Sequence, residues 1–173
     1  QNLEEFKAAL DIQGICMQNI TYADEKGNIM FIANGKVPKR DPQFDWTSVL
    51  RGDTSATLWT EYVPESELEQ VLNPDCGYVF NANNSAFENT CFDEYGLPED
   101  VDPNIGYRPG KQTNRGNRSM QILEDMSTIT YEQLIAFKFD HTFPEKMVFL
   151  KDYPIDQVFR LSKEKYPDLE DAI

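Results

Sequence analysis

The sequence predicts an α+β fold, and three observations support this. Two apolar runs, residues 16–22 and 29–33, flank a polar, glycine-containing loop at residues 24–28 and predict an antiparallel hairpin. The aromatic-rich run Tyr78–Phe80 follows a turn signal and predicts a further strand. From Thr113 onward, apolar residues recur at helical spacing. We therefore expect a small antiparallel sheet followed by helices.

Other elements of the first half surround the hairpin. Residues 2–10 predict a short helix with its leucines and phenylalanine on one face. Residues 36–56 lack clear periodicity and predict an irregular segment that wraps a surface or a site. A short strand is expected at residues 57–62. Pro64 then opens a predicted helix over residues 65–72, whose first turn is acidic, as the helix dipole prefers.

Helices dominate the predicted second half. The helix that starts after Thr113 carries Met120, Ile122 and Leu123, and Thr130-x-x-Gln133 resembles a capping box at the start of another. A further helix is expected over residues 155–165, and residues 168–173 look like the first turn of one more. We expect all of these elements to form one region, residues 1–173.

An acidic loop is expected at residues 85–111. Clustered carboxylates can bind calcium, but their spacing here fits no EF-hand loop, so a solvated loop is the preferred interpretation. The carboxylates in question are Asp93, Glu94, Glu99, Asp100 and Asp102.

Composition limits the classes of partner. The 173 residues include 30 acidic and 16 basic side chains, and the net charge of −14 argues against nucleic acid and anionic membrane surfaces. No apolar run reaches the roughly 18 residues of a membrane span. The three cysteines show no metal-binding spacing; Cys76 and Cys91 could pair, but free or buried thiols are the preferred interpretation. The lone His141 has no catalytic companion and is expected to be structural or exposed.

The segment Asn73–Asn84 concentrates the polar chemistry of the chain. It opens with Asn-Pro and ends with three asparagines within four residues. Asparagine is a poor strand former, but a fixed side-chain amide can donate to a developing oxyanion. The competing interpretation is a polar loop whose asparagines bond their own backbone.

Asn73–Asn84 resembles the "NPxxGY(I/V)xNxNN" segment of the penicillin acylase family, which also includes acyl-homoserine-lactone and aculeacin acylases. Residues 19–40 resemble the family's "N-x-x-Y-A-D-x-x-G-N-I … G-x-x-P-x-R". Trp59 and Pro64 fit its "W-x-G-x-x-P" spacing, although Glu61 replaces the glycine. The resemblance implies part of the four-layer αββα sandwich of the N-terminal-nucleophile (Ntn) hydrolases. The hairpin and the Tyr78–Phe80 strand would lie in its sheets, with the later helices outside.

The resemblance also implies hydrolysis of a linear amide in an N-acyl substrate. In this family the nucleophile is the first residue of a mature chain, and it must be Ser, Thr or Cys. Gln1 cannot serve as this nucleophile. We therefore expect an internal portion of a longer enzyme, truncated at both ends, inactive alone and partnered by the remainder of that enzyme. The whole enzyme is expected to be periplasmic or secreted.

Two residues acquire catalytic roles from the resemblance. The family's oxyanion-hole asparagine falls on Asn83, and its site-orienting arginine falls on Arg115, with Arg118 as the second choice. Ala82 stands where the family usually has an aromatic residue, which alters the acyl pocket rather than the amide donor. No cofactor is required; some members of the family hold a structural calcium, but no ligands are assigned here.

A different class of protein is the alternative. A stand-alone acidic α+β binding module without catalysis would explain the missing nucleophile without truncation. Such a module would end in capped, complete elements, whereas a fragment would expose broken sheet edges and apolar surface.

Overall fold

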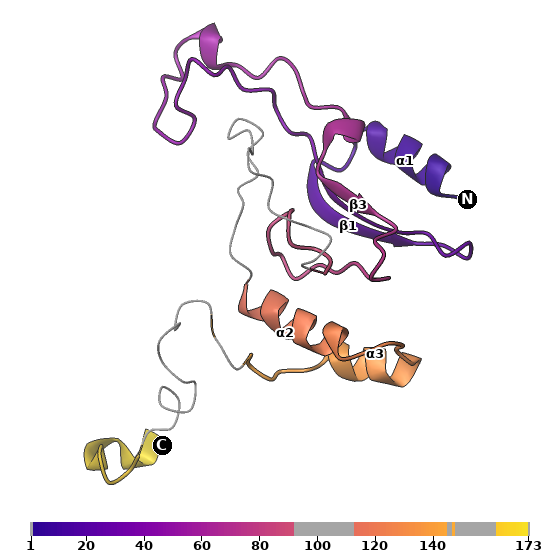
Figure 1. The fold of residues 1–173 in the computed structure, drawn as a ribbon. Helices are drawn as coiled ribbons and strands as arrows, with labels where there is room; N and C mark the ends of the chain where they lie inside the picture. The colour runs from indigo at the N-terminus through magenta and orange to yellow at the C-terminus, as the bar shows by residue number, and fades with distance from the viewer. Residues whose placement is uncertain (1, 92–112, 145–146, 148–161, 173) are drawn as a thin grey trace. The chain divides into compact units, whose positions relative to one another are not determined.

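The computed structural model describes residues 2–91, 113–144, 147 and 162–172 (Figure 1). The chain forms two compact units, Gln1–Lys111 and Gln112–Ile173, and each is described by itself. Among the described residues, no helix combines the length and the apolar character that crossing a membrane requires.

The first unit is built on a three-stranded antiparallel sheet in the order β1-β2-β3. β1 (Met17–Ala23) pairs with β2 (Ile29–Gly35) along its whole length, and β2 also pairs with β3 (Gln70–Leu72). This confirms the predicted hairpin. Gly27, with φ of 86°, occupies a loop position that an L side chain would strain.

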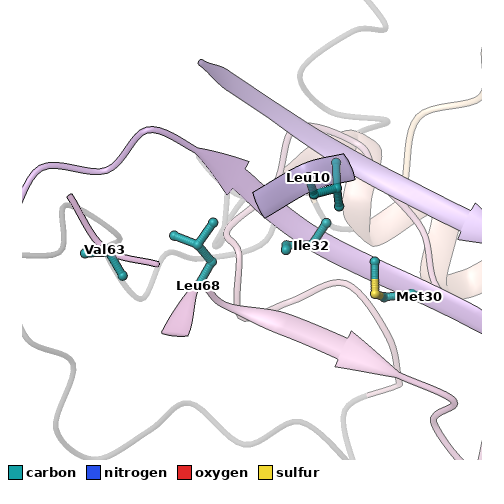
Figure 2. Close-up of a cluster of buried hydrophobic side chains, with 5 residues drawn as sticks. All are labelled: Leu10, Met30, Ile32, Val63 and Leu68. Atoms are coloured by element: carbon teal, nitrogen blue, oxygen red, sulfur yellow. The ribbon is translucent and has the colours of Figure 1, made fainter. Parts of the chain in front are cut away.

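Side chains alternate between the two faces of a strand, and residues 30–35 of β2 are all buried. Both faces of β2 are therefore covered. Met30 and Ile32 pack with Leu10 of α1 (Leu3–Asp11) and with two further apolar side chains (Figure 2). Those two are Val63 and Leu68. Complete burial of a side chain such as Met30 or Ile32 contributes about 1.5–3 kcal/mol.

The opposite face of β2 carries Phe31 and Ala33. These residues pack with Val71, with Val79 of the asparagine-rich segment, and with Ala86 just after that segment. The helix and this segment therefore belong to the two separate clusters formed by alternate residues of β2.

The predicted first helix is confirmed as α1. The side chain of Asn2 caps it by accepting a hydrogen bond from Glu5 N at 3.0 Å. Lys7 ties the helix to β3, because its Nζ donates to Gln70 Oε1 at 3.1 Å and lies 3.8 Å from Glu65 Oε1.

Two other predictions for the first unit are wrong. Residues 57–62 form no strand: the 3-10 helix η1 (Ser55–Thr57) precedes irregular chain, and Tyr62 makes an isolated bridge to Pro38. Residues 65–72 form no α-helix, because the short η2 (Glu65–Glu67) gives way to β3. Pairing of β3 with β2 buries Val71, and this tertiary contact overrides the local helical preference.

The second unit contains α2 (Asn114–Glu124), α3 (Tyr131–Lys138) and the 3-10 helix η3 (Pro167–Ala172). Thr113 caps α2, and Thr130 with Gln133 forms the predicted capping box of α3. Both predicted helices are therefore confirmed.

The remaining predictions for the second half have mixed outcomes. Most of the helix expected at residues 155–165 lies outside the described residues, and its described end contains a turn rather than a helix. Residues 168–172 lie in a 3-10 helix instead of an α-helical turn. The acidic residues between 93 and 102 also lie outside the described residues.

Candidate functional site

The asparagine-rich segment is a loop, so the predicted strand at Tyr78–Phe80 is wrong. Its backbone is held from within the same loop: Phe80 N donates to Asn89 O at 2.9 Å, and Thr90 Oγ1 donates to Tyr78 O at 2.8 Å. A strand would need a ladder of such bonds along a neighbouring strand. Irregular backbone here leaves side chains to fix the conformation.

A disulfide closes this loop. Cys76 and Cys91 are bonded, with their Cα atoms 6.4 Å apart, which is normal for a disulfide. The preferred interpretation of these cysteines as free or buried thiols is therefore wrong, and the alternative pairing is the one observed. Cys16 has a free, exposed thiol.

Asn84 holds the loop from inside. Its Oδ1 accepts from Ala82 N at 2.9 Å, and its Nδ2 donates to Asn89 Oδ1 at 3.2 Å and to the Glu88 carbonyl. Asn84 is 7% exposed and Asn89 is fully buried, and Asn89 donates in turn to the Ala86 carbonyl. Asn89 was not singled out from the sequence, although it lies two residues before the second cysteine. Both asparagines have a structural role, because each pairs buried polar groups of this loop.

Asn81 connects the loop to the hairpin. Its Oδ1 accepts from Asn19 Nδ2 on β1 at 3.2 Å and from Asn83 N at 3.0 Å. The same oxygen therefore holds the backbone of Asn83 and links the loop to the sheet.

Asn83 itself is exposed and has a φ of 54°. Asparagine tolerates this left-handed conformation better than most residues do. Because the chain is not extended here, strand alternation does not place Asn83 and Asn81 on one face, and only the family resemblance selects Asn83. The arrangement presents a primary amide at the surface of the loop on a backbone that Asn81 holds.

A second polar network lies at the hairpin corner. The carboxylate of Asp24 accepts from Tyr22 Oη at 3.0 Å and from Asn28 N and Nδ2 at 2.9 and 2.8 Å. These hydrogen bonds, chiefly that from the Asn28 side chain, hold the pKa of Asp24 below its ordinary value. Asn73 completes the corner: its Oδ1 accepts from Ile29 N at 2.8 Å, and its Nδ2 donates to Asn28 Oδ1 at 3.1 Å. These motif residues therefore stabilise the hairpin.

A cavity of about 380 Å³ lies beside the loop, and we call it the strand-end cavity. It is lined by residues 16–19, 33–38 and 84–86, and by Arg40. Its volume is within the range of small-molecule sites. Lys36 and Arg40 line it, but no acidic residue does, and Asn83 is not among its lining residues.

The two candidate arginines of the second unit differ in their surroundings. Arg118 donates through Nε to Asp140 Oδ2 at 2.6 Å, which ties α2 to the chain that follows α3. Hydrogen bonds from Thr142 and from the Arg118 guanidinium lower the pKa of Asp140 to about 2. Arg115 is exposed in the first turn of α2. Asn83 and Arg115 belong to different units.

Within the part of the chain that the structure describes, no three His, Cys, Asp or Glu side chains gather where they could hold an ion. The calcium considered from the sequence stays a prediction, since the acidic residues between 93 and 102 are outside that part.

Comparison with known proteins gives the family. Residues 1–170 match the family model described as penicillin amidase. The fold is similar to that of a thermostable penicillin G acylase from Alcaligenes faecalis, with a TM-score of 0.58 and 22% sequence identity. That match covers 79% of this chain and 22% of the acylase chain, so this chain spans a minor part of it. The α+β class and the resemblance stated above are confirmed. The chain belongs to the penicillin amidase family.

Proposed function

We propose that this chain is part of an amidohydrolase that cleaves the linear amide bond of an N-acyl substrate. The observation that carries the proposal is the family match over residues 1–170, which includes the whole asparagine-rich loop. The match favours the amidohydrolase over the non-catalytic binding module. Hydrolysis of amide bonds is the general activity of the family.

The proposed chemistry divides the work between this chain and the rest of the enzyme. An N-terminal nucleophile outside this chain attacks the amide carbonyl, whose oxygen becomes negatively charged in the tetrahedral intermediate. The Asn83 side-chain NH₂ donates a hydrogen bond to that oxygen, and Arg115 orients the site. Such a donor accelerates the reaction because its bond strengthens as the charge develops. The intermediate then collapses and expels the amine, and water releases the acyl group from the nucleophile.

Support for the role of Asn83 comes from the loop. Its backbone is held by the 3.0 Å bond from Asn83 N to Asn81, and its side chain is exposed. A held backbone restricts the positions that the amide can reach, and this favours preorganised stabilisation of an oxyanion. The strand-end cavity supports a small-molecule substrate beside the same loop.

We infer the partners and the location of the whole enzyme from the same family match. The partners are an N-acyl small molecule and the remainder of the same enzyme, and neither nucleic acid nor a membrane is among them. No cofactor is required for this chemistry. We place the whole enzyme in the periplasm or outside the cell.

The test is hydrolysis of a panel of chromogenic N-acyl amides of increasing acyl length by the full-length protein. Asn83→Ala should lower kcat by about 10²–10³-fold and change KM by less than about twofold. Arg51→Ala is the matched control, because Arg51 is an exposed residue paired with exposed Asp53, and its kinetics should equal those of the wild type. The 173-residue chain alone should hydrolyse none of the amides.

Two results would overturn the proposal. One is the absence of hydrolysis by the full-length protein across the whole panel. The other is an Asn83→Ala variant whose kcat equals that of the control.

A further inference from the structure

The segment that carries Asn83 has no regular secondary structure of its own. Between Cys76 and Cys91 the chain forms neither helix nor strand. The disulfide joins the two ends of this segment, which are 15 residues apart, and Asn81–Asn84 lie inside it. The loop therefore depends on side-chain hydrogen bonds and on one covalent bond for its shape.

These bonds form a continuous path from the disulfide to Asn83. Thr90, next to Cys91, has its Oγ1 3.2 Å from Cys76 Sγ and bonded to Tyr78 O. Asn89, the next residue back, accepts from Phe80 N through its carbonyl and from Asn84 through its side chain.

Asn84 completes the path. Its Oδ1 holds Ala82 N at 2.9 Å, directly before Asn83. Asn84 and Thr90 are 7% and 2% exposed, so their hydrogen bonds are shielded from competing water. The path therefore connects the disulfide to the backbone that presents Asn83.

We propose that Cys76 and Cys91 are positioning residues for Asn83, so that reduction of their disulfide lowers the catalytic rate without unfolding the protein. This rests on the proposed function of Asn83. The cluster that packs α1 on β2 contains no residue between Cys76 and Cys91, whereas Val79 and Ala86 of the loop pack in the other cluster on β2. The first cluster therefore remains to hold the fold when the disulfide is reduced. Loss of the bridge should therefore loosen the loop selectively.

The redox step is simple. Cys76 is exposed and Cys91 half-buried, so a small dithiol reaches the bridge. Dithiothreitol supplies two electrons and two protons, the S–S bond breaks to give two thiols, and the reagent closes to its cyclic disulfide. An oxidant of the disulfide class, such as oxidised glutathione, reverses the change.

The first arm of the test measures the loop without using activity. Amide hydrogen exchange is compared before and after reduction in the full-length protein carrying Cys16→Ser. This change leaves Cys76 and Cys91 as the only cysteines of the 173-residue chain. Phe80, Ala82 and Asn83 should exchange at least about tenfold faster in the reduced protein. The amides of Lys26 and Asn28, which bond Asp24 in the hairpin corner, are the internal control and should be unchanged. Equal exchange of the loop amides in both states would overturn the inference.

The second arm measures catalysis in the same Cys16→Ser background. Reduction, or the double change Cys76→Ser with Cys91→Ser, should lower kcat by about tenfold or more while KM changes by less than about twofold. Reoxidation should restore kcat only where both cysteines are present. In an Asn83→Gly variant, reduction should have little additional effect, because the donor that the bridge positions is already absent.

The two arms separate the inference from the proposed function. Faster exchange with an unchanged kcat would overturn the inference, as would an equal effect of reduction in the Asn83→Gly variant. No hydrolysis by the oxidised protein would contradict the proposed function instead, and the exchange arm alone would then decide whether the bridge orders the loop.

Discussion

Two regions of this chain use asparagine and aspartate side chains to hold irregular backbone, and they differ in what they leave at the surface. At the hairpin corner, Asp24, Asn28 and Asn73 bond one another and the ends of two paired strands. In the Cys76–Cys91 loop, asparagines bond a backbone that forms no strand, and Asn83 is exposed with a left-handed backbone conformation. The motif residues of the corner therefore have structural roles, whereas those of the loop include the exposed Asn83, for which we propose a catalytic role.

Neighbouring residues of one family motif can differ in burial and in hydrogen bonding. The paired asparagines Asn83 and Asn84 are adjacent, yet one is exposed and the other is 7% exposed with three hydrogen bonds. Buried amides that pair other buried groups maintain the fold, because an unpaired partner would remain if they were removed.

The largest expected effect on stability in this comparison is at Asn84. Asn84→Ala leaves Ala82 N and Asn89 Oδ1 without their partner, so the free energy of unfolding should fall by about 1–3 kcal/mol. Its effect on kcat should be far smaller than that of Asn83→Ala. Urea unfolding of the full-length protein measures the first quantity, and amide hydrolysis the second. A loss of stability no greater than that of Asn83→Ala would remove the distinction between the two neighbours.

A smaller effect is expected at the corner. Asn73→Ala removes the hydrogen bonds to Ile29 N and Asn28 from an exposed site and places alanine at a φ of 49°. We expect a loss of about 1 kcal/mol in the free energy of unfolding and no change in kcat of the folded protein. Asn73→Gly accepts the positive φ, so comparing the two variants separates backbone strain from the lost side-chain bonds. A large decrease in kcat would show that the corner, too, belongs to the site.

The smallest effect concerns pH and the second unit. Asp140 has a pKa of about 2 in the folded chain, below its ordinary value of 3.8. A lowered carboxyl pKa contributes stability that is fully present above the ordinary value and is lost as the pH falls from about 4 to about 2. Protection of the Thr142 amide, which bonds Asp140, should fall over that range. Asp140→Asn should remove this pH dependence, and a variant that keeps it would assign the effect to another group.

Local patterns predicted the elements that are held by local interactions. The hairpin follows from two apolar runs around Gly27, and the starts of α2 and α3 follow from Thr113 and Thr130. The predictions for residues 65–72 and 78–80 were wrong because these conformations depend on partners outside the local pattern. The partner is β2 for the first stretch and Asn89–Thr90 for the second.

The candidate site, too, could be predicted from the sequence only in part. Residue type and the family resemblance selected Asn83 and Arg115, but the burial that distinguishes Asn84 from Asn83 is a property of the folded loop. The Cys76–Cys91 pairing was one open alternative, because two cysteines flanking a predicted strand do not by themselves show that their side chains meet.

The most direct test of the central claim compares binding of substrate and of a transition-state analogue by Asn83→Gly, which removes the amide and tolerates the φ of 54°. The probe is a phosphonate analogue of the best amide substrate from the panel, because its tetrahedral centre carries the oxyanion that Asn83 is proposed to bind. The inhibition constant should rise by about 10²–10³-fold, while KM changes by less than about twofold. Equal changes in both constants, or no change in either, would contradict the claim that the Asn83 amide serves the transition state.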